Sequence, residues 1–183
     1  MRKLISLSIL PILMASAAVA QTAGYAGQQA REIKALSAAE TADLLAGRGM
    51  GLAKAAELNH DPGPMHVLEL AGELSLTQAQ GETVRASQSR MAAAAKPLGA
   101  EVVERERTLD QGFRDGTITA ETLAAQVDRI GVLQGQLRMV HLAAHLETRA
   151  ALTPKQVAIY DAARGYTASP GGQERRHGGH PPG

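Results

Sequence analysis

The sequence predicts an all-α protein built on a long, bent antiparallel helical hairpin with shorter flanking helices. Three observations predict it. Apolar residues repeat at helical spacing through two long segments, helix-start signals recur along the chain, and large side chains are scarce, with one Phe, three Tyr and no Trp. A core of ordinary thickness is hard to build from Leu, Val, Ala and Met alone, so thin helical layers suit this composition better.

The first long helix is expected from Gln78 to Arg114. Its apolar positions recur at steps of three, four or seven, which places them on one helical stripe. They are Val84, Met91, Ala95, Leu98, Val102, Leu109 and Phe113. Pro97 lies inside the segment, where a proline costs about 3 kcal/mol. Because the stripe continues in phase on both sides, we expect a kink near residues 93–96 rather than a break.

The second long helix is expected to begin after Thr119, a good N-cap residue. Its apolar positions repeat at steps of three and four. They are Leu123, Val127, Ile130, Leu133, Leu137, Val140 and Ala144. Each long segment is about 30 residues, or about 45 Å if helical. Asp115 and Gly116 form a short turn between them, which predicts an antiparallel hairpin.

The pattern Leu-Thr-x-x-Gln occurs twice and predicts two further helix starts. The motif residues are Leu76, Thr77 and Gln80, and then Leu152, Thr153 and Gln156. A Thr followed three residues later by Gln is a capping box, in which each side chain satisfies a backbone N–H of the first helical turn. The leucine before each Thr can act as a hydrophobic staple. These residues are interpreted as structural rather than as direct ligands of a bound protein.

Shorter helices are expected on both sides of the hairpin. Ser37 and Glu40 form a third capping box, opening a helix that Gly47 ends. Residues 48–51 form a glycine-broken link. Another helix is expected from about Pro64 to just before the first Leu-Thr-x-x-Gln motif, and a terminal helix from the second motif to near Gly165.

The first twenty residues have the layout of a secretory signal peptide, with a basic start, an apolar middle and a small-residue end that predicts cleavage after Ala20. An uncleaved anchor is the alternative. We expect a lead segment at 21–36, the helical domain at 37–166 and a disordered tail at 167–183. No other stretch is apolar enough to cross a bilayer, so no stable membrane insertion is expected.

Composition excludes several functional classes. Removal of residues 1–20 takes away Arg2 and Lys3, leaving 17 basic against 18 acidic residues and a formal charge of −1, so no nucleic-acid footprint is expected. Cysteine is absent, which excludes disulfides, thiol catalysis and thiolate metal sites. No nucleophile elbow, phosphate-binding glycine loop or HExxH motif occurs, so the sequence predicts a non-enzymatic protein.

The signal peptide, the helical mature chain with its long hairpin, and the doubled motif together resemble the LTxxQ proteins. These are the periplasmic Spy/CpxP-type chaperones and their relatives, the zinc-resistance-associated proteins and heavy-metal sensors. The resemblance covers roughly residues 37–166. It implies a Spy/CpxP-like fold, a periplasmic location and an antiparallel homodimer. It also implies either ATP-independent binding of unfolded envelope proteins or periplasmic metal binding.

Histidines provide the candidate metal ligands. His141 and His145 stand four residues apart, so both side chains emerge on one face of the second long helix, where two imidazoles can bind a single Zn, Ni or Cu ion. His66 could join them if its helix folds back over the hairpin. The alternative is a pair of boundary histidines that cover the edge of the core. In the tail, His177 and His180 form a weaker candidate, and a solvated terminus is the simpler interpretation.

Three functions therefore follow from the sequence. The first is a chaperone-type envelope-stress protein that binds unfolded or partly folded clients on the hairpin and requires no cofactor. The second is a periplasmic heavy-metal sensing or resistance protein that uses the helix-borne histidines. The third is a structural interaction module with one defined partner.

Overall fold

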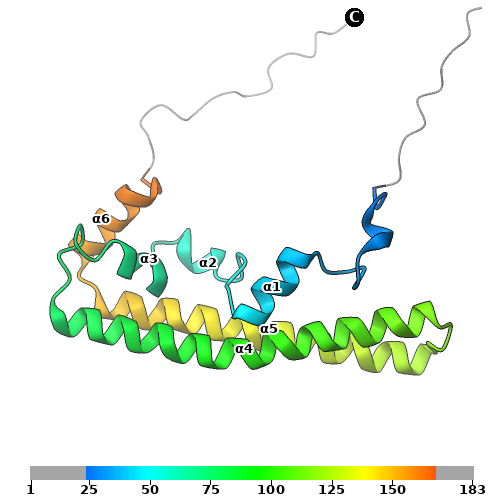
Figure 1. Cartoon of the computed structure of the whole chain (residues 1–183). Helices are drawn as coiled ribbons and strands as arrows, with labels where there is room; N and C mark the ends of the chain where they lie inside the picture. The colour runs from blue at the N-terminus through cyan, green and yellow to red at the C-terminus, as the bar shows by residue number, and fades with distance from the viewer. Residues whose placement is uncertain (1–23, 168–183) are drawn as a thin grey trace, which may run out of the picture. The chain divides into compact units, whose positions relative to one another are not determined.

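The computed structural model describes residues 24–167, and these residues are helical, as predicted (Figure 1). Among them, 71% are in helices and none is in a strand; an isolated bridge joins Ile33 and Leu36. The chain divides into two compact units, one ending at Ala30 and the other beginning at Arg31. The first unit contains a short 3₁₀ helix, η1 (Gln28–Ala30). The expected signal peptide and nearly all of the expected tail lie outside the described residues.

Two long antiparallel helices dominate the second unit, and the bounds of the first and the start of the second match the prediction. Helix α4 spans Gln78–Arg114 and helix α5 spans Ala120–Ala151. They run side by side along their length (Figure 1). Helix α4 continues through Pro97 without a break, as expected. Within residues 24–167, no helix combines the length and the apolar character that crossing a membrane requires.

Four shorter helices complete the unit. Helix α1 (Ala38–Ala46) packs on α4, α2 (Lys54–Glu57) on α5, and α3 (Pro64–Glu69) on both long helices; α6 (Pro154–Arg164) follows α5. The first three line one side of the hairpin (Figure 1). The capping boxes predicted at the starts of α1, α4 and α6 are present, as are the glycine caps that end α1 and α6.

One predicted helix end is wrong, and one helix was not predicted. Helix α3 ends at Glu69 rather than just before the first motif, because the following residues turn through Gly72 to Ser75, whose φ of 49° is left-handed and cannot continue a helix. Helix α2 is a single turn whose N-cap, Ala53, makes no side-chain cap hydrogen bond. It therefore carries none of the signals that mark the other starts.

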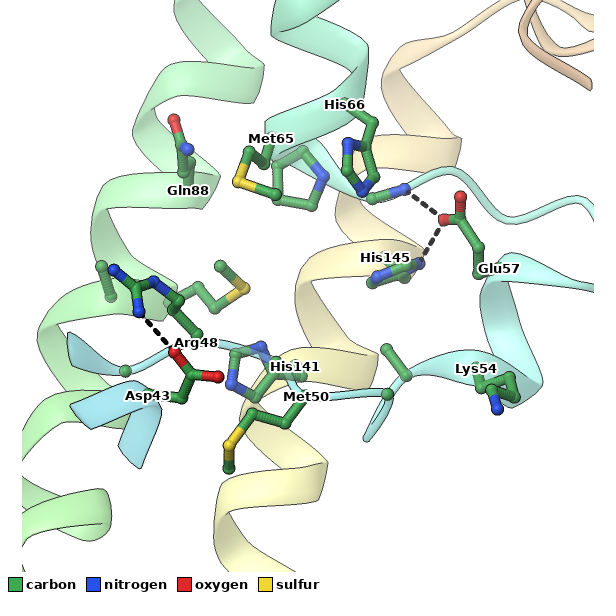
Figure 2. Close-up of a pocket in the computed structure, with 18 of the residues that line it drawn as sticks. Asp43, Arg48, Met50, Lys54, Glu57, Met65, His66, Gln88, His141 and His145 are labelled. Atoms are coloured by element: carbon green, nitrogen blue, oxygen red, sulfur yellow. Dashed lines mark hydrogen bonds and ion pairs between the residues drawn. The ribbon is translucent and has the colours of Figure 1, made fainter. Parts of the chain in front are cut away.

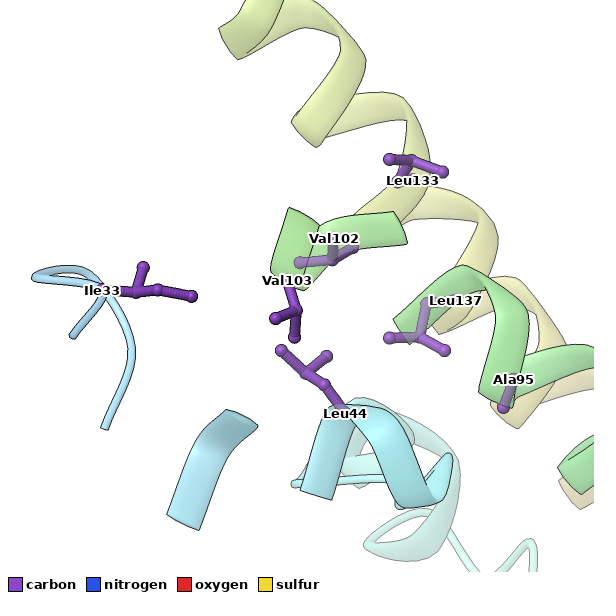
Figure 3. Packing of buried hydrophobic residues seen from close by; sticks show 7 residues of the cluster. All are labelled: Ile33, Leu44, Ala95, Val102, Val103, Leu133 and Leu137. Carbon is purple, nitrogen blue, oxygen red and sulfur yellow. The ribbon is translucent and has the colours of Figure 1, made fainter. Parts of the chain in front are cut away.

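A hydrophobic cluster holds α1 on the middle of the hairpin (Figure 3). Its buried members are Ile33, Leu44, Ala95, Val102, Val103, Leu133 and Leu137. The helices approach so closely that a Cβ built on Gly99 would lie 2.0 Å from the carbonyl oxygen of Leu44. Only glycine permits this crossing. Ile33 lies within the expected lead segment, so residues 31–36 pack with the helical domain.

The apolar stripe is not buried along its whole length. Near the α4–α5 turn, Phe113 is 58% exposed and Val127 is 51% exposed, although both lie on the predicted stripe. This end is covered only in part, by residues 32–34, which contact Asp110 and Arg114, whereas the middle of the hairpin is covered by α1–α3. Helical periodicity therefore overestimates burial at this end.

A second cluster closes the other end of the hairpin. It comprises Val67, Leu74, Val84, Leu152, Val157 and Tyr160, drawn from α3, α4, α6 and the segments between them. Both motif leucines belong here, since Leu152 is buried and Leu76 packs against the cluster. The two Leu-Thr-x-x-Gln motifs therefore meet in space.

Each motif glutamine first completes its own cap. The backbone N–H of Thr77 donates to Gln80 Oε1 at 3.0 Å, and the backbone N–H of Thr153 donates to Gln156 Oε1 at 2.9 Å. In return, each Thr hydroxyl accepts from the backbone N–H of its glutamine at 3.2 Å. These bonds satisfy donors at the starts of α4 and α6 that would otherwise lack intrahelical partners.

The two glutamines then bind each other reciprocally. Gln80 Nε2 donates to Gln156 Oε1 at 2.9 Å, and Gln156 Nε2 donates to Gln80 Oε1 at 3.0 Å. Their remaining N–H groups donate to the carbonyls of Ala151 at 2.9 Å and Leu74 at 3.2 Å. Both side-chain amides are thus saturated with hydrogen bonds. This pairing explains why the motif occurs twice.

We expect removal of either glutamine to destabilise the fold by more than its own hydrogen bonds, because its partner amide is left unsatisfied. Gln80→Ala and Gln156→Ala should each lower the free energy of unfolding by about 1–3 kcal/mol. In a double-mutant cycle they should couple by at least about 0.5 kcal/mol. Urea denaturation measures both quantities. The matched control is Gln78→Ala on the exposed face of α4, and additive single effects would contradict the pairing.

Candidate functional site

A pocket of about 490 Å³ lies between the hairpin and the segments that cover it (Figure 2). All three sequence-predicted metal ligands line it. His141 and His145 come from α5, and His66 comes from α3, which folds back over the hairpin as the hypothesis required. Three methionines line the same pocket: Met50 from the α1–α2 link, Met65 from α3 and Met91 from α4.

The ring of His145 is oriented by the loop before α3. Its Nδ1 lies 2.7 Å from the carbonyl oxygen of Asp61, which can only accept a hydrogen bond, so Nδ1 carries the proton. In the neutral ring, the lone pair is therefore on Nε2. A Cβ built on Gly63 would lie 2.9 Å from Nε2, so a side chain there would occupy the space beside this nitrogen.

His66 is oriented in the same way by its own helix. Its Nδ1 lies 2.9 Å from Glu69 Oε2, and the carboxylate accepts the ring proton. In the neutral ring this again leaves Nε2 with the lone pair. Metal-binding histidines characteristically donate their second ring N–H to a carboxylate or a backbone carbonyl, which sets the tautomer and raises ligand basicity. His66 shows the first arrangement and His145 the second.

His141 is the most deeply buried of the three, at 3% exposed. Its Nε2 is buried and has no hydrogen-bond partner. The α1–α2 link covers the ring, since a Cβ on Gly49 would lie 3.4 Å from Nδ1. Burial, and secondarily the nearby His145, lower the pKa of His141 below its usual value. The ring is thus kept neutral, the form in which imidazole binds a metal.

The carboxylates beside the histidines already have partners. Glu57 Oε1 accepts from the hydroxyls of Tyr160 at 2.6 Å and Tyr166 at 3.0 Å, and Glu57 Oε2 accepts from the Gly63 N–H at 3.2 Å. Burial and the bond to Glu57 raise the pKa of Tyr160, so that it remains a donor. Glu57 Oε2 also lies 3.7 Å from His145 Nδ1 (Figure 2). Asp43 pairs with Arg48.

This arrangement is suited to a transition-metal ion but is not a closed metal site. Within residues 24–167, no group of three or more His, Asp or Glu side chains is arranged to hold a metal ion. The three imidazoles share one pocket without converging on a point, and an ion would have to draw them together. The unpaired Nε2 of His141 and the oriented rings of His66 and His145 are suited to binding such an ion.

Some candidate residues lie outside the pocket, and some pocket residues were not predicted from the sequence. The Leu-Thr-x-x-Gln residues do not line the pocket and hold helix starts together, in line with their structural interpretation. Met50, Met91 and Glu57 were not identified from the sequence. The available signal was Met50 between two glycines, a pattern that marks a close backbone approach. His177 and His180 lie outside the described residues.

Comparisons with known proteins give no independent support for a family. The chain matches no protein-family model, no curated protein and no solved structure.

The lowered pKa of His141 predicts a pH-dependent stability. Protons bind the unfolded chain more readily than the folded one, so this contribution is present above the usual pKa of 6.5 and is lost as pH falls below it toward the folded value. His141→Gln, which cannot titrate, should flatten this loss. Urea midpoints measured from about pH 7.5 to about pH 5 test it, since histidine is the group that titrates there.

The variant retains the other titratable and charged side chains of the pocket, among them His145, His66, Asp43 and Arg48, so the difference between the two curves reports on His141 and its interaction with His145. Parallel curves for parent and variant would contradict the prediction.

Proposed function

We propose that this protein is a periplasmic metal-binding protein of the LTxxQ type, acting as a sensor or buffer, and that its ion binds in the pocket of His66, His141 and His145. The observation that carries the proposal is the state of the three rings. Two have Nδ1 held by oxygen acceptors and Nε2 free, and the third has a buried Nε2 without a partner. A pair of boundary histidines that only covers the edge of the core would not require a buried ring nitrogen without a hydrogen-bond partner.

The ion would be one that imidazole prefers, such as Zn, Ni or Cu. His141 and His145 are one turn apart on α5, so both can reach the same ion. His66 would reach it from α3, which links the hairpin to the segments above it. Bound metal would therefore connect elements that are otherwise joined only by packing and a few hydrogen bonds.

We expect calorimetric titration with zinc, nickel and copper salts to show a binding transition that depends on the pocket. A His141→Ala/His145→Ala variant should bind at least about tenfold more weakly, since ligands and their orienting partners are typically worth that much. The titrations belong in a His177→Ala/His180→Ala background, which removes competition from the tail.

His60→Ala is the matched control, because His60 pairs with Asp161 outside the pocket. It should leave the transition unchanged. Equal affinity in the parent and the double variant would reject this site.

A second function is favoured by a row of exposed apolar side chains on the outer surface of α5. Val132, Met139 and Leu146 are 51%, 66% and 62% exposed, and their spacing of seven residues places them on one line along the helix. Exposed apolar side chains in a row suit the binding of unfolded segments, or of a second copy in a homodimer. We therefore retain ATP-independent chaperone activity toward envelope proteins as the second candidate.

For this second function, we expect the protein to suppress aggregation of a chemically denatured client without nucleotide. A Val132→Gln/Met139→Gln/Leu146→Gln variant should lose that protection with little change in melting temperature, because the replaced side chains are exposed. Light scattering measures both aggregation and oligomeric state, and Gln136→Ala on the same helix is the control. A parent protein without any protective effect would eliminate the chaperone function.

A further inference from the structure

We propose that the pocket selects a soft monovalent ion, Cu(I) or Ag(I), and that Met50, Met65 and Met91 supply thioether ligands beside the three histidines. This inference rests on the proposed metal-binding function and names the class of ion. Thioether sulfur is a soft ligand that favours Cu(I), whereas oxygen ligands suit harder ions.

The side chains that line the pocket include three imidazoles and three thioethers. Its two carboxylates are engaged, Glu57 with two tyrosine hydroxyls and a backbone N–H, and Asp43 with Arg48. An ion that needs several carboxylate ligands would compete with these bonds. An ion that accepts imidazole and thioether finds the Nε2 atoms and the methionines uncommitted.

The formal charges of the pocket side chains also favour a monovalent ion. The pocket is lined by two acids and two bases, Asp43 and Glu57 against Arg48 and Lys54, so their formal charges cancel. Much of the remaining wall is alanine, glycine and proline. The Born cost of transferring an ion into such surroundings grows with the square of its charge, so a divalent ion pays about four times as much as a monovalent one.

The methionines are placed on three separate elements around the histidines. Met65 precedes His66 on α3 (Figure 2), and Met91 lies on α4 and also lines the pocket. Met50 has a φ of 43°, a left-handed conformation that a methionine rarely adopts, and follows the Gly49 that covers His141. This strained backbone places Met50 in the link that covers the most deeply buried imidazole, with the methionine itself 43% exposed.

The test uses silver nitrate in chloride-free buffer as a redox-inert probe for Cu(I), in the His177→Ala/His180→Ala background. Calorimetry should show that a Met50→Leu/Met65→Leu/Met91→Leu variant binds Ag(I) at least about tenfold more weakly than the parent. Leucine conserves the methionine volume, so the fold should be retained. Met139→Leu, an exposed methionine on α5, is the matched control and should bind as the parent does.

A second measurement on the parent protein does not depend on any variant folding. In a spectrum of ¹³C-labelled methionine methyl groups, Ag(I) should shift the signals of Met50, Met65 and Met91 and leave Met139 in place. Loss of affinity in the triple variant together with these shifts supports the inference. Silver binding without methyl shifts overturns it.

The two proposals fail in different ways. Histidine-dependent binding of zinc or nickel, with neither methionine dependence nor methyl shifts for silver, would leave the metal-binding function intact and overturn the choice of a soft monovalent ion. If neither silver nor any divalent ion depends on the pocket histidines or perturbs the methionines, both proposals are rejected.

Discussion

The reciprocal amide pair between Gln80 and Gln156 is the contact that holds together the end of the hairpin away from the α4–α5 turn. It joins the first turn of α4 to the first turn of α6 and, through the Ala151 and Leu74 carbonyls, to the segments that precede those turns. A capping box is ordinarily a local device. Here the glutamines of two capping boxes bind each other. The residues that begin two helices therefore also position those helices against each other.

A series of hydrogen bonds connects α6 to the pocket. Tyr160 is completely buried and donates to Glu57, which also accepts from the Gly63 N–H and lies beside His145. The loop between α2 and α3 is thereby held where the Asp61 carbonyl can orient the His145 ring. Helix packing, the partly buried carboxylate of Glu57 and the imidazole tautomer form one connected arrangement, and the proposed binding site is built on it.

The hairpin could be predicted closely because its signals are local. The caps at Thr77 and Thr119 and the apolar repeat place α4 at the bounds observed and α5 at its observed start. The spacing of His141 and His145 likewise determines that they share a face. The contribution of His66 depended on how α3 folds back, which no periodicity encodes, and Met50 lies on an irregular link whose position is set by packing on the hairpin. The turn that ends α3 early was missed for a related reason, since a left-handed Ser75 leaves no distinctive sequence mark.

The two parts of the fold differ in how far apart their contacts lie along the chain. Helices α4 and α5 are adjacent in sequence and meet across a short turn. The hydrogen bonds that α6 makes to earlier parts of the chain, such as Tyr160 to Glu57, join residues 76 to 103 positions apart. Contacts between sequence neighbours carry a smaller loop-closure entropy and form sooner. The hairpin can therefore assemble as an early scaffold, with α1–α3 and α6 docking on it later. Because the covering segments depend on the hairpin for their packing, they are the part we expect to open first, and such a local opening would expose the pocket while the hairpin stays folded.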